Sequence, residues 1–177
     1  MECQPLEADR TNMNSRYLLV PALAALVLSA RPVGVGSCNS LASTGTVGVG
    51  SGGAFGAPAL AAIGQPNIDG SGAFGFRITG GVPNAPGILA LSRNEQPQFS
   101  GTYQTTLYAG PTPVFVLFQF DANGEANVRP ASTTAPIAEL CGRALIAQAA
   151  CFDFTAPGGA GWTNGLRFSF GLPAPVK

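Results

Sequence analysis

Large apolar residues recur at every second position in three short stretches, 74–79, 114–120 and 166–170. Side chains of a β-strand point alternately to the two faces of a sheet, so this repeat predicts strands rather than helices. In the first and third stretches the intervening residues are polar, charged or glycine, which predicts one buried face. The middle stretch, "VFVLFQF", is apolar on both faces and predicts a central strand.

Turn signals separate these stretches from further short runs at 88–92 and 102–108, which we also expect to be strands. Asn123-Gly124 predicts a hairpin after residue 120, because both residue types tolerate positive φ. Seven or eight short strands predict an all-β fold. We expect a single antiparallel β-sandwich, jelly-roll-like or immunoglobulin-like, with a barrel as the alternative.

Two segments near the C-terminus need separate treatment. Residues 143–154, "RALIAQAACFDF", suit a helix by their alanines, but their neighbours and the alternating Phe152 and Phe154 favour a long strand. Asn164-Gly165 predicts a second turn, directly before a last strand with Leu166, Phe168 and Phe170 inward. We therefore expect Trp162 to cap the edge of the core.

Three regions follow from composition: a signal peptide over 1–30, a Gly/Ser-rich lead-in over 31–53 and a β-sandwich domain over 54–177. Arg16, an apolar run of 14 residues (17–30) and small residues at its end are typical of an export signal. A membrane-spanning helix needs about 20 apolar residues, so we expect no transmembrane segment in the mature chain. Met13 is an alternative start, and Cys38 in "VGSC" an alternative lipid-attachment site. The lead-in is either flexible or one irregular edge strand.

Three cysteines, Cys38, Cys141 and Cys151, remain after removal of the signal. If 143–154 is one strand, Cys141 and Cys151 stand about 30 Å apart, far beyond the ~7 Å that a disulfide allows between Cα atoms. We therefore predict a disulfide from Cys38 to either Cys141 or Cys151. It would join the lead-in to the sheet, and it suits a secreted protein.

Charge and residue content exclude several functions. Nine basic residues balance nine acidic ones, so no basic surface for nucleic acid is expected. The chain has no histidine, which removes Ser-His-Asp and Cys-His catalysis. "GVGSGG" at 48–53 fits a dinucleotide-binding spacing, but no helix can follow it, and a flexible linker is the better interpretation. We predict that the chain is not an enzyme and needs no cofactor.

Two sets of residues are candidates for binding. Asp121, Asn123 and Glu125 surround a glycine and make a calcium loop conceivable, although the full ligand pattern is absent and a plain hairpin is favoured. Aromatic faces with polar neighbours are typical of sugar sites and equally of strand surfaces. The candidates of this kind are Trp162, Tyr103 and Tyr108.

The order of several motifs over 45–172 resembles a secreted domain abundant in planctomycetes and related bacteria. The matching residues are Pro58, Leu60, Gly64, Pro66 and Gly70, then Asp121 and Gly124, then Gly142, Leu145, Gln148 and Asp153, then Thr163, Asn164, Gly165 and Leu166. The resemblance implies an exported β-rich module, often C-terminal in larger surface proteins, with no catalytic residues.

Together these observations predict a non-enzymatic secreted or cell-envelope module with a structural or adhesive role. Its edge strands carry few of the charged residues that prevent pairing between sheets, so these strands could pair with other copies of the chain. The alternative is a carbohydrate-binding module that uses Trp162 and nearby tyrosines. A surface glycan is therefore the second conceivable partner.

Overall fold

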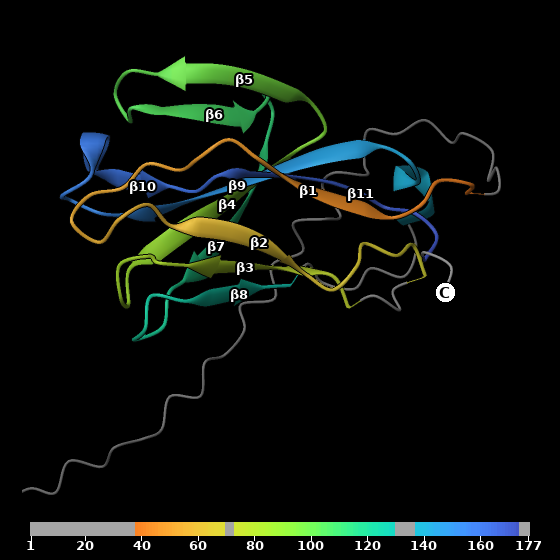
Figure 1. Cartoon of the computed structure of the whole chain (residues 1–177), viewed down its shortest axis with the longest axis horizontal. Helices are drawn as coiled ribbons and strands as arrows, with labels where there is room; N and C mark the ends of the chain where they lie inside the picture. Colours follow the sequence, from red (N-terminus) through yellow and green to blue (C-terminus); the bar gives the residue numbers. More distant parts are fainter. Residues whose placement is uncertain (1–37, 70–72, 130–136, 174–177) are drawn as a thin grey trace, which may run out of the picture.

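The computed structural model describes residues 38–69, 73–129 and 137–173 (Figure 1). These residues form antiparallel sheets that pack against each other, with no α-helix among them. The prediction of an all-β sandwich is confirmed. The expected signal peptide, 1–30, lies outside the described residues.

The largest sheet has six strands. Five of them run in the spatial order β1-β11-β9-β4-β7, and β10 pairs with the end of β9. Their bounds are β1 Ser43–Val47, β4 Pro86–Ser92, β7 Val114–Gln119, β9 Ala144–Phe152, β10 Ala160–Trp162 and β11 Gly165–Ser169. Strand β9 therefore lies in the middle of the sheet, with β1 and β7 at its edges.

Two smaller units cover the two faces of this sheet. One is a three-stranded sheet in the order β2-β3-β8, and the other is a hairpin of β5 and β6. Figure 1 shows them on opposite sides of the large sheet. Their bounds are β2 Ala59–Ile63, β3 Gly75–Thr79, β8 Ala126–Val128, β5 Glu95–Ser100 and β6 Thr105–Ala109. Two short 3₁₀ helices, η1 (Ile137–Leu140) and η2 (Pro157–Gly159), complete the described elements.

The core fills the space between the large and the three-stranded sheets. It uses the inward side chains of the alternating segments, and Phe76, Ile78 and Phe168 are almost fully buried. The ring of Phe74 lies 5.1 Å from those of both Phe76 and Phe168, centroid to centroid. The Phe74–Phe76 contact is edge-to-face, and contacts of this kind add to the free energy gained by burial. The predicted inward direction of Leu166, Phe168 and Phe170 is confirmed.

The segment 143–154 forms the long strand β9, as predicted, and not a helix. The prediction of a central strand at 114–120 is wrong. Strand β7 is an edge strand, paired on one side with β4. Of the predicted strand at 102–108, residues 102–104 belong to the turn between β5 and β6.

Both predicted Asn-Gly turns need correction. Asn123-Gly124 does form a tight turn, in which Gly124 has φ of 72°, but the strands that flank it enter different sheets rather than one hairpin. Asn164-Gly165 makes no turn. The chain continues from β10 into β11 with a one-residue shift in its pairing to β9, from Trp162↔Ala150 to Leu166↔Ala147. Such a shift is a β-bulge.

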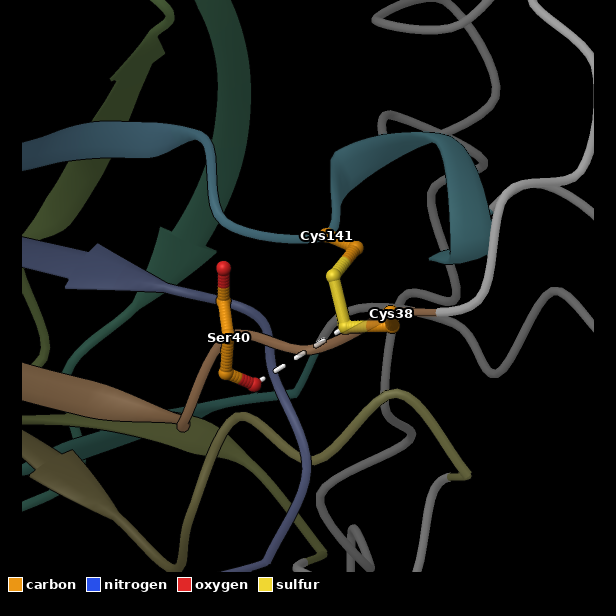
Figure 2. Close-up of a disulfide and its surroundings, with 3 residues drawn as sticks. All are labelled: Cys38, Ser40 and Cys141. Atoms are coloured by element: carbon orange, nitrogen blue, oxygen red, sulfur yellow. Dashed lines mark hydrogen bonds between the residues drawn. A yellow bond between two sulfur atoms is a disulfide. The ribbon is translucent and has the colours of Figure 1, made fainter.

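A disulfide joins Cys38 to Cys141, one of the two pairings predicted (Figure 2). The two Cα atoms lie 5.7 Å apart, across 103 residues of sequence. Cys38 lies shortly before β1, and Cys141 directly follows η1 and precedes β9. The bond therefore links the segment just before the edge strand β1 to the segment just before the central strand β9. Within the Gly/Ser-rich lead-in, Ser43–Val47 forms this edge strand by pairing with β11.

Replacing both half-cystines, C38S/C141S, should lower the free energy of unfolding by about 2–5 kcal/mol. A cross-link over about 100 residues removes much of the entropy of the unfolded chain. Urea unfolding with and without dithiothreitol measures the loss. The reductant should destabilise the natural chain and a C151A control, and leave the double variant unchanged. A reductant-insensitive natural chain would contradict this pairing.

Candidate functional site

The large sheet has one face toward the core and a second face, here called the outer face. Register assigns Ile88 and its partners Leu117 and Ala150 to the outer face, because the neighbouring Leu89 and Ala149 lie in the core. The same alternation places Gln148, Phe115 and Phe152 on the outer face. The β5–β6 hairpin covers only part of this face, near Gln148.

Gln148 makes three hydrogen bonds, and two of them hold the hairpin to the sheet. Its Nε2 donates to the carbonyl oxygens of Thr106 and Thr163, both at 3.0 Å, and its Oε1 accepts from the backbone N–H of Tyr108 at 3.0 Å. The side chain is buried, and a buried amide without partners would cost several kcal/mol. The three bonds thus make Gln148 a structural residue rather than an exposed ligand donor.

The structure brings two of the three predicted aromatic binding residues together. The Tyr103 and Trp162 rings lie 5.3 Å apart at an interplanar angle of 52°. Both side chains are half-buried, and no partner of the buried Trp162 Nε1 is found in the described part of the chain. Tyr108 lies elsewhere, over Gly165 and Gly48, where a Cβ on either glycine would overlap its ring or hydroxyl. These rings fill the space between hairpin and sheet.

Five large apolar side chains are exposed near β7 and at the far end of β9, and we call them the outer apolar surface. They are Phe55, Phe115, Leu117, Phe152 and Phe154. Phe154 is 94% exposed, Leu117 64% and Phe115 54%. Isolated apolar residues on a surface are ordinary, but several large ones close together mark interaction surfaces.

Part of this surface is hollowed. An open hollow of about 510 Å³ is lined by Phe55, Phe152 and Phe154 together with Val82, Ala85 and Pro86. Almost all of its wall consists of carbon atoms. A wall of this kind has few groups that could hydrogen-bond a sugar, and it favours apolar contacts.

Asp153 is buried at the rim of the hollow and orders the neighbouring loop. Its Oδ2 accepts from the backbone N–H of Gly53 at 3.1 Å, and its Oδ1 accepts from the N–H and hydroxyl of Thr155 at 2.9 and 2.6 Å. Burial acts to raise the pKa of this carboxyl, but the hydrogen bonds outweigh it and lower the pKa below its usual value. Both carboxylate oxygens of Asp153 therefore accept hydrogen bonds from groups of the protein itself.

Thr163 and Asn164 hold the bulge between β10 and β11. The Thr163 hydroxyl accepts from the Ala149 N–H at 2.9 Å and donates to the Asn164 carbonyl at 2.7 Å. The Asn164 amide imitates a peptide unit beside β2. Its Oδ1 accepts from the Leu60 N–H at 2.9 Å, and its Nδ2 donates to the Leu60 carbonyl at 3.0 Å. One side chain therefore links the two sheets.

The predicted calcium loop is organised by hydrogen bonds within the protein. Asp121 Oδ1 accepts from the N–H groups of Asn123 at 2.8 Å and Glu125 at 2.9 Å, and these bonds lower the pKa of the Asp121 carboxyl. The Glu125 carboxylate pairs with Arg77, with 2.8 Å between Oε2 and Nη2. No group of three or more His, Cys, Asp or Glu that could hold a metal occurs in the part of the chain that the structure describes.

Other chemically active groups are few among the residues that the structure describes. Cys151 has a free thiol in the core, and burial raises its pKa, so the reactive thiolate is disfavoured.

In 38–69, 73–129 and 137–173, no helix has the length and apolar character needed to cross a membrane. Comparison with protein-family models, curated proteins and solved structures finds no match.

Sequence reasoning missed the outer apolar surface. The alternating Phe152 and Phe154 were visible as part of a strand, but Phe154 lies beyond the end of β9. Phe115 and Leu117 were assigned to a covered face, because the pattern alone does not give the position of β7 in the sheet. The sequence does contain one signal for an exposed apolar surface in this region: no charged residue occurs between Glu95 and Asp121.

Asn164→Asp should lower the free energy of unfolding by about 2–4 kcal/mol. The change removes the donor to the Leu60 carbonyl and places a charge at a buried site. Urea unfolding of N164D measures the loss. The same change at the exposed Asn127 of β8, N127D, is the matched control and should cost less than about 0.5 kcal/mol. Equal losses would contradict the role of Asn164.

Acid should destabilise the chain partly through Asp153. Its pKa is lower in the folded chain than in the unfolded chain, so its stabilising effect is present above about pH 4 and is lost as the pH falls through the folded value. Thermal melting between pH 6 and pH 2 should show a smaller acid-dependent decrease for D153N than for the natural chain. An E139Q control, at an exposed residue of η1, should retain the full decrease. An unchanged profile in D153N would refute this assignment.

Proposed function

We propose that the chain is a non-enzymatic module of the cell surface or envelope, with a structural or adhesive role, and that it acts through the outer apolar surface. The observation that carries the proposal is the exposure of large apolar side chains on β7 and around the hollow at the end of β9. Phe115 and Leu117 lie on an edge strand, and Phe154 is almost fully in solvent. Exposure of such groups to water is unfavourable, and contact with another surface removes them from it.

The engagement of the acidic residues supports a role without catalysis. Glu95 pairs with Arg167 and Glu125 with Arg77. Asp121 and Asp153 order their own loops by accepting backbone N–H groups. General acid–base chemistry needs carboxyl groups that face a substrate, and these four are instead engaged by groups of the protein.

Two further observations support an extracytoplasmic location. The disulfide between Cys38 and Cys141 is of a kind that persists in oxidising compartments. The residues on which the resemblance to secreted planctomycete domains rests include Asp121, Gln148, Asp153 and Asn164, and the hydrogen bonds of these four side chains hold the fold. Structural roles for these four polar residues agree with the proposal of an exported module that is not an enzyme.

The carbohydrate alternative has less support. Stacking on a sugar needs an open aromatic face with polar groups beside it. Tyr103 and Trp162 are half-buried against each other, and Tyr108 packs on Gly165. Three exposed aromatic side chains, Phe55, Phe152 and Phe154, lie instead around the carbon-lined hollow.

Latex beads coated with the full chain test the proposal. Beads should be retained under flow on methyl-terminated monolayers and much less on hydroxyl-terminated ones. In F115T/L117T, threonine keeps the preference for a strand while most of the apolar area is lost. We expect retention by this variant to fall several-fold, with the unfolding curve little changed.

The matched control is L41T/V49T. Leu41 and Val49 are also exposed, and they lie next to β1 at the opposite edge of the large sheet. This variant should be retained like the natural chain. If F115T/L117T is retained as well as its control, the outer apolar surface is not adhesive and the proposed function is wrong.

A further inference from the structure

Strand β7 combines two properties that conflict within one copy of the chain. Its sequence, "VFVLFQ", is apolar on both faces, which is the pattern of a strand covered on both sides. Its place is the edge of the large sheet, and in the described residues only β4 pairs with it. On the core side Val114, Val116 and Phe118 are only half-buried, and on the outer side Phe115 and Leu117 are exposed.

The other free edges of the two main sheets lack this character. Strand β1 carries Ser, Thr and Gly, and β8 has three residues. The edge of β2 is engaged by the Asn164 amide. Soluble proteins commonly protect an edge with charge, proline or a bulge, and β7 has none of these between residues 114 and 119.

We propose that β7 pairs antiparallel with β7 of a second copy, so that the two large sheets become one continuous sheet across a two-fold axis. This inference rests on the proposed function, because it names the partner for the β7 part of the same surface. A partner for β7 must offer free backbone groups and apolar side chains on both faces. Among the described free edges of the two main sheets, β7 itself meets this requirement best.

The pairing is compatible in register and charge. Antiparallel pairing about Val116 places Phe115 opposite Leu117 of the second copy on the outer face, and Val114 opposite Phe118 on the core face. No charged residue occurs between Glu95 and Asp121, so no like charges face each other within the paired strands. An isologous contact of this kind closes after two copies and does not propagate into a fibre.

The available area indicates a weak dimer. Phe115 and Leu117 are each more than half exposed, which corresponds to about 100 Å² of apolar area per side chain. Together with the strand backbone and the half-buried core-side residues, two copies would bury on the order of 800 Å², below the ~1,200 Å² of stable interfaces. We therefore expect a reversible dimer that forms at high concentration, as on a crowded surface.

Sedimentation equilibrium of the full chain from about 10 µM to about 1 mM tests the proposal. The natural chain should show a concentration-dependent dimer. F115K/L117K and F115E/L117E should each be monomeric, because like charges would face each other. An equimolar mixture should restore a one-to-one heterodimer. This result also shows that both variants are folded.

A natural chain that stays monomeric throughout would overturn the pairing, as would a mixture of the charged variants that does not associate. Dimers that persist in both charged variants would place the contact elsewhere and overturn it too. The bead assay separates this failure from that of the proposed function. Beads can adhere through the outer apolar surface although β7 does not pair, and loss of adhesion in F115T/L117T with a monomeric natural chain supports the function alone.

Discussion

Burial of β9 on both faces is the constraint on which the rest of the structure depends. Seven consecutive residues, from Leu145 to Cys151, are buried, although a strand in a two-layer sandwich needs only one covered face. The three-stranded sheet covers Leu145, Ala147, Ala149 and Cys151. The opposite face carries Gln148, and the β5–β6 hairpin must cover it. The hairpin therefore belongs to the fold as a third layer over part of the sheet.

The same constraint explains where the polar residues lie. An amide or carboxylate that is removed from water must be given hydrogen-bond partners. Gln148 obtains them from the hairpin and the bulge, Asn164 from β2, and Asp153 from the loop around Gly53. Each of these side chains joins two segments far apart in sequence. The polar residues that look most like site residues therefore have structural roles, whereas several large apolar side chains remain exposed.

This division explains what could be predicted from the sequence. Segments 75–79, 144–152 and 165–169 were predictable because their strand character depends on their own residues. Strands β2, "ALAAI", and β5, "EQPQFS", were missed because alanine, proline and charged residues are poor strand formers, and these strands depend on their partners. Asn164-Gly165 has the local signature of a turn, but its amide bonds Leu60, 104 residues away. A local pattern does not contain that partner.

The incorrect prediction for β7 has a different origin. The pattern of 114–120 reports how much of the strand is apolar, and it does not specify whether the covering atoms belong to the same molecule. In β9 the demand for two covered faces is met within the chain by the small sheet and the hairpin. In β7 the core face is only partly covered, the outer face is exposed, and one of the two edges is paired, with β4. A contact between molecules is the arrangement in which the sequence pattern of β7 and its position in the sheet agree.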